Sequence, residues 1–388
     1  MPLLAARLIH GSPFRRGISG ARTARWLAGA VLFALGPFAY AAPMSLSWSQ
    51  LPPIPDAEGF AAPFAGVSGG ALIVAGGANI PEDKWAAVFA KKWYDSIFVL
   101  DRPDGTWKTA GKLPRPLGYG VAVSWEDQVV CVGGSDATGH FRDVFALRWQ
   151  DGAIQTTPLP ALPRPCANAC GTIIGSIIYV AGGIATPTAT AALRTLWALD
   201  LAAAEPAWRE LEPCPGPARM LAVAGVSEGA FFLFSGASLG PDREGKAVRE
   251  YLRDAWRFTP GGGWKRLADL PRAAVAGPSP AATTSDGRLL IFTGDDGANV
   301  TFAPVEKHPG FPRSALAYDP RTDRWSAAGE IPISRATAPT TVWQSRVIIP
   351  NGEVRPRVRT PEVWAIETQE PGRPRRESAT RGGGAPPP

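Results

Sequence analysis

The sequence is poor in the side chains that most often bind metals. Its 388 residues include three histidines and four cysteines. His10 lies in an N-terminal segment discussed below, which leaves only His140 and His308 in the rest of the chain. Zinc and copper centres built on histidine and cysteine need more ligands than these. We also find no nucleotide-binding motif, so we expect neither a metal nor a cofactor.

The cysteines do not define a disulfide framework. Cys131 lies inside an apolar run, which is typical of a buried thiol. Cys166 and Cys170 could form a disulfide in an exported protein, but sequence alone does not give the connectivity of Cys131, Cys166, Cys170 and Cys214.

The central part of the chain lacks an excess of positive charge, although the formal charge of the whole chain is +6. Residues 1–41 contain five arginines and no acidic residue, and residues 368–388 contain four arginines and two glutamates. Residues 42–367 therefore hold 31 basic and 32 acidic residues. A nucleic-acid-binding surface needs clustered positive charge, so we expect no nucleic-acid partner.

The sequence also lacks an apolar run long enough to span a bilayer, which takes about 20 residues. Its N-terminal apolar run, residues 26–38, follows Arg15, Arg16, Arg22 and Arg25 and precedes Ala39-Tyr40-Ala41. Basic residues, a short apolar run and a small-x-small site are the parts of a cleavable export signal. We predict that residues 1–41 are a signal peptide and that the mature protein is periplasmic or secreted, with no membrane partner.

Turn-forming residues and tryptophan are abundant, with 43 glycines, 40 prolines and 14 tryptophans. Short strands joined by turns give this composition. An apolar run ending in small residues recurs every 50–60 residues or so, near the period of about 50 of kelch repeats. We expect each run to be an inner strand of one repeat; the runs are 72–77, 129–134, 178–183, 232–236, 290–294 and 347–352.

A second alternating run follows each of these, and a tryptophan near a Leu-Pro or Ile-Pro turn usually follows that. The second runs are 95–100, 143–147, 196–199, 254–258, 315–318 and 362–366, and the tryptophans are Trp107, Trp208, Trp264 and Trp325. Large aromatic side chains can fill the space that widens between radially arranged sheets. The pattern predicts an all-β fold, a kelch-type β-propeller with six four-stranded blades.

The sixth repeat has no tryptophan strand of its own, but residues 47–52 (SWSQLP) supply one at the other end of the chain. This N-terminal strand should complete the last blade and close the ring, because closure removes two free sheet edges. We therefore assign residues 42–367 to the propeller. Residues 368–388 are rich in proline, glycine and arginine, and we predict a disordered tail.

Four segments carry a resemblance to one family. Residues 351–359 (NGEVRPRVR) resemble the N-G-E-x-x-P-G-x-R segment of the N-acetylneuraminate epimerases, also called sialic acid mutarotases. Residues 59–66 (GFAAPFAG), 91–97 (KKWYDSI) and 115–120 (RPLGYG) are also similar to that family. The likeness covers most of residues 46–367. The N-G-E blade comes last here, so the chain resembles the cyclically permuted branch, an order that a closed ring tolerates.

This resemblance implies an isomerase that interconverts the α and β anomers of a sialic acid by acid/base ring opening and reclosure. It makes Glu353 the catalytic base and Arg359 a second required residue. Arg357 departs from the pattern, because the family has glycine there. If that position has positive φ, arginine costs about 1 kcal/mol or more.

Further polar residues are candidates for binding an anionic sugar. We predict substrate contacts from Arg115, Tyr119, Asn79, Lys92, Arg164, Arg219 and Arg335. The alternative for these arginines is turn chemistry and ion pairs between blades. For the whole chain, the alternative is a non-catalytic kelch propeller that binds a protein or a glycan, since a fold does not fix a function.

Overall fold

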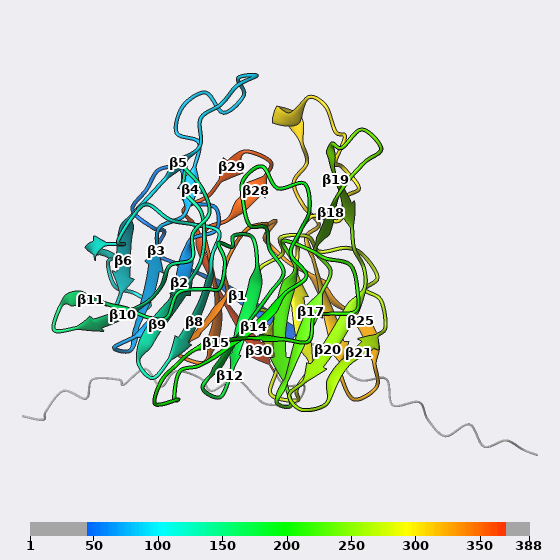
Figure 1. Cartoon of the computed structure of the whole chain (residues 1–388). Coiled ribbons are helices and arrows are strands. Elements are labelled where there is room, and N and C mark those ends of the chain that lie inside the picture. Colours follow the sequence, from blue (N-terminus) through cyan, green and yellow to red (C-terminus); the bar gives the residue numbers. More distant parts are fainter. Residues whose placement is uncertain (1–44, 370–388) are drawn as a thin grey trace, which may run out of the picture. The chain divides into compact units, whose positions relative to one another are not determined.

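A computed structural model describes residues 45–369, which form strands joined by turns and loops (Figure 1). The predicted signal, residues 1–41, lies outside this range. The last strand, β30, runs through Gln369, two residues into the predicted tail, and the remainder of that tail is also outside the described range. The described residues contain one short 3-10 helix, η1 (Val305–Lys307), and no helix that could span a membrane.

Six four-stranded antiparallel sheets form the fold, and each is one blade of the predicted propeller. From the innermost strand outward, blades 1 to 3 are β2 (Phe64–Ser68), β3 (Ala71–Ala75), β6 (Ser96–Leu100) and β7 (Lys108–Lys112); β8 (Val121–Trp125), β9 (Gln128–Val132), β10 (Val144–Gln150) and β11 (Ala153–Pro158); and β12 (Cys170–Ile174), β13 (Ile177–Ala181), β14 (Leu196–Asp200) and β15 (Trp208–Leu211).

Blades 4 and 5 follow the same order, and blade 6 takes its outermost strand from the N-terminal end. They are β16 (Val223–Ser227), β17 (Ala230–Phe234), β20 (Ala255–Thr259) and β21 (Gly263–Leu267); β22 (Ala282–Thr283), β23 (Leu289–Phe292), β24 (Ser314–Asp319) and β25 (Arg324–Glu330); and β26 (Thr341–Trp343), β27 (Arg346–Pro350), β30 (Val363–Gln369) and β1 (Ser45–Leu51).

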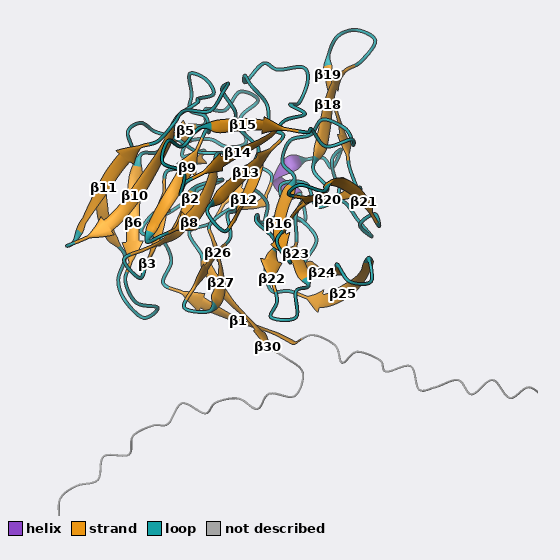
Figure 2. Ribbon diagram, turned by 60° about the horizontal axis from the view of Figure 1, so that its bottom comes forward, coloured by secondary structure: helices purple, strands orange, loops and turns teal. Residues whose placement is uncertain are grey.

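The blades form a closed ring (Figure 2). Within residues 45–369, six apolar clusters each lie between two neighbouring blades. The cluster between blades 6 and 1 contains Leu72 and Val74 of β3 together with Ile348 of β27. Burial of apolar side chains is the main favourable term in folding, so the gaps between blades hold the core. The predicted six-bladed kelch-type propeller is confirmed.

The predicted closure by the N-terminal strand is also confirmed. β1 pairs antiparallel with β30 along its whole length, and Trp48 lies opposite Ile366. β30 in turn pairs with β27. The first described strand thus supplies the outermost strand of the last blade, which gives β30 a partner on both sides.

One detail of the sequence interpretation was wrong. The six recurring apolar runs are the second strands of the blades, such as β3 and β9, and the innermost strands are the strands that precede them, such as β2 and β8. A second strand has a strand on each side and a neighbouring blade against each face. Both of its faces are therefore apolar, as in β3, where all five residues are buried.

The recurring tryptophans tie neighbouring blades together. In four blades the indole Nε1 donates a hydrogen bond to a backbone carbonyl of the preceding blade or its connection: Trp107 to Pro52 O (2.7 Å), Trp208 to Pro160 O (2.8 Å), Trp264 to Glu212 O (2.8 Å) and Trp325 to Ala268 O (2.9 Å). Each indole ring therefore fills the gap between two blades, and its N–H has a hydrogen-bond partner there.

Three hairpins project from one side of the ring, the upper side in Figure 1. They are β4–β5 (Ala78–Asn79 and Lys92–Trp93), β18–β19 (Ala237–Pro241 and Ala247–Tyr251) and β28–β29 (Glu353–Arg355 and Val358–Arg359). The loop that carries η1 rises on the same side. We call this side the upper mouth of the channel.

Candidate functional site

Six backbone hydrogen bonds form a closed ring around the channel. Each blade contributes one residue whose N–H donates to the carbonyl of the equivalent residue in the preceding blade, at 2.6–2.9 Å. All six residues have positive φ, although none is glycine. They are Ala62, Tyr119, Asn168, Leu221, Ala276 and Thr337. The left-handed conformation costs roughly 1–2 kcal/mol per residue, which the ring of hydrogen bonds helps to offset.

These six residues line one section of the central channel, a space of about 610 Å³ that includes open solvent. In every blade the residue just before the ring residue pairs with the residue that follows the glycine of the second strand. In blade 6 this pairing joins Ala336 to Glu353. Glu353 therefore lies next to Thr337 of the ring, at the upper mouth.

The β28–β29 hairpin brings Glu353 and Arg359 together. The two residues are direct partners in the hairpin, and Nη1 of Arg359 lies 3.1 Å from Oε1 of Glu353. The Arg359 side chain is 3% exposed and the Glu353 side chain 18% exposed. A ligand in the channel can therefore reach the carboxylate more easily than the guanidinium behind it.

Two further donors face the Glu353 carboxylate. The backbone N–H of Arg357 donates to Oε1 at 3.2 Å, and the hydroxyl of Thr337 donates to Oε2 at 3.4 Å. Nε and Nη1 of Arg359 have no partner in hydrogen-bond geometry within the described range, so its contact with Glu353 is an ion pair. These contacts fix the carboxylate beside the channel.

Arg357 has a φ of +70°, the conformation that favours the glycine of the related family. Its side chain reaches the loop between β4 and β5, where Nη1 donates to the carbonyls of Lys84 (3.0 Å) and Ala86 (3.2 Å). The guanidinium also lies 4.2 Å from the ring centroid of Phe89. Arg357 thus connects the hairpin that carries Glu353 to the adjacent projecting loop.

The predicted candidates Tyr119, Asn79 and Lys92 have different surroundings. Tyr119 lines the channel and accepts a hydrogen bond from Lys91 Nζ at 3.1 Å. Asn79 is 1% exposed, and its amide is occupied by Tyr94 and by the carbonyl of Gly59. Lys92 is exposed over the Tyr94 ring. Only Tyr119 of these three is placed to meet a ligand in the channel.

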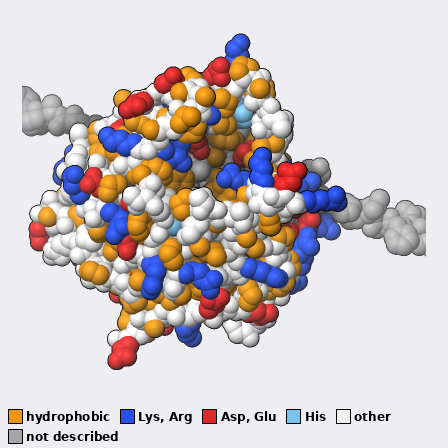
Figure 3. Space-filling model, turned by 45° about the horizontal axis from the view of Figure 1, so that its top comes forward, with side chains coloured by type: hydrophobic (Ala, Val, Ile, Leu, Met, Phe, Trp, Pro, Cys, Tyr) orange, Lys and Arg blue, Asp and Glu red, His pale blue; other side chains and the backbone are white. Residues whose placement is uncertain are grey.

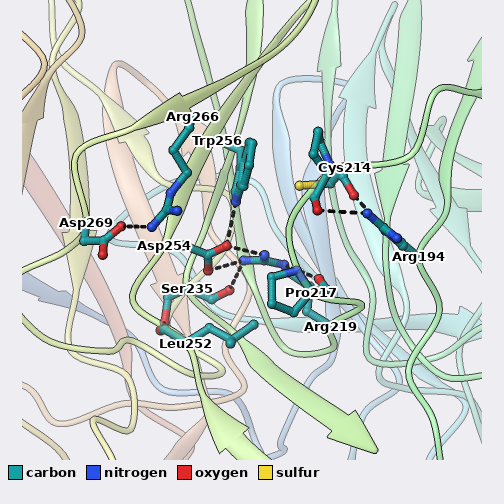
Figure 4. A network of polar contacts seen from close by, with 11 residues as sticks. Arg194, Cys214, Pro217, Arg219, Ser235, Leu252, Asp254, Trp256, Arg266 and Asp269 are labelled. Carbon is teal, nitrogen blue, oxygen red and sulfur yellow. Dashed lines mark hydrogen bonds and ion pairs between the residues drawn. The ribbon is translucent and has the colours of Figure 1, made fainter.

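Arg219 and Arg335 are each 2% exposed, and each guanidinium forms an ion pair with a carboxylate. Arg219 forms two parallel hydrogen bonds with Asp254, Nη1 to Oδ1 at 2.8 Å and Nη2 to Oδ2 at 2.6 Å (Figure 4). Arg335 Nη2 donates to Glu362 Oε2 at 2.5 Å. Neither guanidinium lines the channel. Both arginines therefore form ion pairs, which was the alternative to substrate binding in the sequence analysis.

Arg115 and Arg164 lie nearer the surface. Arg115 pairs with Asp143 at 3.0 Å, and Arg164 approaches Glu210 at 3.5 Å. The expected arginine cluster is therefore replaced by four separate pairs, each with its own acidic partner. Lysine and arginine side chains nevertheless surround the hollow visible on the upper side (Figure 3).

The structure singles out Lys91, which sequence reasoning did not choose as a site residue. Its Nζ lies 4.7 Å from the ring centroid of Tyr119 and 5.4 Å from that of Trp93, so its ammonium is held over the channel side of blade 1. Lys91 and Lys92 look alike in sequence. In the structure Lys91 contacts Tyr119 of the ring, whereas Lys92 pairs with Asn79 in the β4–β5 hairpin.

Cys131, Cys166, Cys170 and Cys214 are all free and buried. Burial raises the pKa of the Cys166 and Cys170 thiols to about 12, and that of Cys131 is raised by burial as well. These thiols are therefore unreactive in the folded protein. Within residues 45–369 no group of three or more histidine, cysteine, aspartate or glutamate side chains could hold a metal ion.

Fold and site together define a six-bladed kelch-type propeller with a carboxylate–guanidinium pair at one mouth of its channel. Residues 40–156 match the family model of N-acetylneuraminate epimerase. The enzyme of that name from Salmonella enteritidis PT4 is 42% identical over 123 residues, which cover 28% of this chain and 32% of the relative. The Brucella suis enzyme is 40% identical over 119 residues, or 27% and 30% of the two chains.

The resemblance predicted from the sequence is confirmed over that segment. The chain spans about a third of the length of these curated relatives. The residues that match the family model, 40–156, include β1 and most of blades 1 and 2 and do not reach Glu353. The solved structure of YjhT has a TM-score of 0.59 with this chain at 14% identity, and the match covers 81% of this chain and 96% of that one. This similarity shows that the two share the fold.

Proposed function

We propose that this protein is an N-acetylneuraminate epimerase, a sialic acid mutarotase that interconverts α and β anomers without a cofactor. The observation that carries the proposal is the Glu353–Arg359 ion pair at the upper mouth. It lies in the segment whose sequence resembles the family motif. The family match in blades 1 and 2 supports the same assignment independently of that motif.

Anomer exchange requires two proton transfers. A base removes the proton of the anomeric hydroxyl, a proton reaches the ring oxygen, and the ring opens to the keto form. The C1–C2 unit then rotates about the C2–C3 bond, and reclosure on the other face of C2 gives the other anomer. Glu353 is the acid/base group in this scheme, because its carboxylate is fixed beside the channel and remains accessible. Such a positioned group contributes about 10²–10⁴-fold to rate.

Arg359 holds that carboxylate in place through the ion pair. Its positive charge also favours an anionic sugar at this mouth. The Lys91 ammonium is the other cation that reaches the channel side, through its contact with Tyr119. We assign the sugar carboxylate to the side of the mouth between these two cations, because charge-assisted hydrogen bonds are the strong ones.

The competing function is a non-catalytic propeller in which Glu353 and Arg359 only stabilise their hairpin. NMR of freshly dissolved N-acetylneuraminate distinguishes the two, because an epimerase speeds α-to-β equilibration well beyond the spontaneous rate. Glu353→Gln should return exchange to that rate with the fold intact. Glu367→Gln, an exposed position in the same blade, is the matched control and should leave the rate unchanged. Exchange that persists in Glu353→Gln contradicts the mechanism.

The location is part of the proposal. An export signal over residues 1–41 would deliver the enzyme to the periplasm or outside the cell. Expression of the full chain followed by fractionation and N-terminal sequencing tests it. Cleavage after Ala41 is the expected result, and an unprocessed cytosolic protein is the contrary one.

A further inference from the structure

One position of the repeat distinguishes blades 5 and 6 from the other four. In each blade it is the residue directly after the glycine at the end of the second strand. This residue pairs with the residue directly before the one that belongs to the hydrogen-bonded ring. The six occupants are Ala78, Ser135, Ile184, Ala237, Asp295 and Glu353. The first four are buried and uncharged. The last two are carboxylates, and both are partly exposed.

The two carboxylates come from adjacent blades at the same mouth. Asp295 exchanges backbone hydrogen bonds with Val275, at 2.8 and 2.9 Å, as Glu353 does with Ala336. The ring residues beside them are joined directly, because the N–H of Thr337 donates to the carbonyl of Ala276 at 2.7 Å. Asp295 therefore repeats the backbone setting of Glu353 one blade away.

The Asp295 carboxylate is held as a hydrogen-bond acceptor. The Tyr251 hydroxyl donates to Oδ2 at 2.7 Å, and the Gly297 N–H donates to Oδ1 at 3.0 Å. Gly297 has a φ of +83°, and a side chain there would meet the Tyr251 ring at 3.0 Å. The turn is therefore shaped around that ring, which also packs against the small apolar cluster of Ala237 and Val275.

Tyr251 serves as a donor to this carboxylate. Burial, and then the hydrogen bond and charge of Asp295, raise the pKa of Tyr251, so its hydroxyl keeps its proton at physiological pH. No cation forms an ion pair with Asp295 among the described residues. Each of its oxygens has a second lone pair, which can accept a hydrogen bond from a ligand hydroxyl.

We infer that Asp295, fixed by Tyr251, binds the hydroxyl groups of the sugar that lie farthest from the sugar's carboxylate. This inference rests on the proposed function and deepens it by assigning the orientation of the substrate. An unpaired negative charge repels the sugar's carboxylate and accepts hydrogen bonds from neutral hydroxyls. The carboxylate end is therefore directed toward Arg359 and Lys91, and the hydroxylated chain toward blade 5.

This arrangement gives the two carboxylates different roles. Glu353 has a guanidinium behind it and performs proton transfer, whereas Asp295 has a neutral phenol behind it and positions the substrate. Two carboxylates in one site can take different roles when their environments differ in this way. Loss of Asp295 should therefore act on substrate affinity, and loss of Glu353 on the rate of the chemical step.

A ligand that cannot open its ring tests binding separately from catalysis. The methyl α-glycoside of N-acetylneuraminate is such a probe, and its dissociation constant can be measured by calorimetry or ligand-observed NMR. Asp295→Asn should weaken its binding at least tenfold. Asp296→Asn removes the same charge one residue away, where the carboxylate only receives the Ala298 N–H, and should change binding less than twofold.

A glycoside with a truncated hydroxyl chain completes the test. It should bind the wild-type protein more weakly, and Asp295→Asn should weaken it no further than twofold. Tyr251→Phe, which keeps the packed ring and the carboxylate, should weaken binding of the full glycoside two- to fivefold. Tyr251→Phe thus tests the same contact by a second variant if Asp295→Asn does not fold.

The outcomes separate this inference from the proposed function. Unchanged binding of the full glycoside to Asp295→Asn, equal weakening of both glycosides, or no binding to the wild-type protein overturns the inference. Specific weakening of the full glycoside alone supports it. If the wild-type protein binds the glycoside in this way but does not accelerate anomer exchange, the proposed activity fails while the binding role of Asp295 stands.

Discussion

Trp48 lies directly opposite Ile366 in the pairing of β1 with β30, so residues 318 positions apart in the chain share one sheet. The Trp48 ring packs edge-on against Phe292 of blade 5 at 5.6 Å and against Trp364 of blade 6 at 6.2 Å. It therefore joins the closing strand to its own blade and to the neighbouring one.

Replacing Trp48 by alanine should lower the free energy of unfolding by roughly 2–4 kcal/mol, because the change leaves a cavity between blades 5 and 6. Urea unfolding followed by circular dichroism measures the difference. Trp85→Ala, at a loop residue that is 37% exposed, should cost less than about 1 kcal/mol. Equal losses at the two positions would show that β1 does not hold the ring closed.

The buried Arg219–Asp254 pair should be sensitive to removal of either partner. Asp254→Asn leaves the Arg219 guanidinium buried without its counter-charge, which typically costs about 3–5 kcal/mol. Arg115→Ala breaks an exposed pair and should cost about 1 kcal/mol or less. Thermal unfolding of both variants beside the wild type checks the contrast. A small effect of Asp254→Asn would mean that water reaches the pair.

The same pair predicts an acid dependence of stability. Burial acts to raise the pKa of Asp254, but the hydrogen bonds and charge of Arg219 outweigh it, and the pKa lies below the ordinary value of 3.8. Between the folded and unfolded values only the unfolded state takes up the proton. The pair's stabilisation is thus complete above about pH 4 and lost as pH falls through the folded pKa. Asp254→Asn should lack this loss of stability at low pH in unfolding experiments between pH 2 and 6.

Arg357→Gly should separate backbone strain from loop anchoring. Glycine relieves the cost of φ +70°, about 1 kcal/mol, while the contacts with Lys84, Ala86 and Phe89 are lost. We expect global stability to change by less than about 1 kcal/mol, but trypsin should cut the β4–β5 loop several times faster. Arg357→Lys keeps the strain and loses the paired contacts, so it should be cut as fast and be less stable. Unchanged proteolysis in both variants would show that the loop is held by other contacts.

Glu353 and Arg359 should act as one unit in anomer exchange. Arg359→Ala is expected to slow exchange by about 10²-fold, because Glu353 loses its orienting partner. The double variant with Glu353→Gln should be no slower than Glu353→Gln alone, since residues that act together are not additive. Exchange rates from NMR give the comparison. If the reductions in exchange rate multiply in the double variant, Arg359 acts independently of Glu353.

Much of the fold could be predicted because its signals are local and repeated. The small-residue ends of the apolar runs coincide with positive φ in all six blades, as at Gly77 and Gly352. The tryptophan missing from blade 6 indicated closure by β1 without any knowledge of contacts. The motif resemblance predicted roles for Glu353 and Arg359 together, and the β28–β29 pairing places these two residues opposite each other.

The partners of charged side chains could not be predicted in the same way. Arg115 and Arg219 follow similar proline-containing turns, yet Arg115 lies near the surface and Arg219 is buried against Asp254, 35 residues later. The equivalence of Asp295 to Glu353 likewise exists only in the pairing within each blade, which the sequence does not display.

The sequence alone determined the number of blades, their order and the way the ring closes, because apolar runs, glycines and tryptophans act over a few residues and recur with one period. Only the tertiary structure decided which polar side chains meet the channel. Burial and charge pairing depend on segments some 20 to 60 residues apart that the ring of backbone hydrogen bonds brings side by side, and no local pattern records those distances.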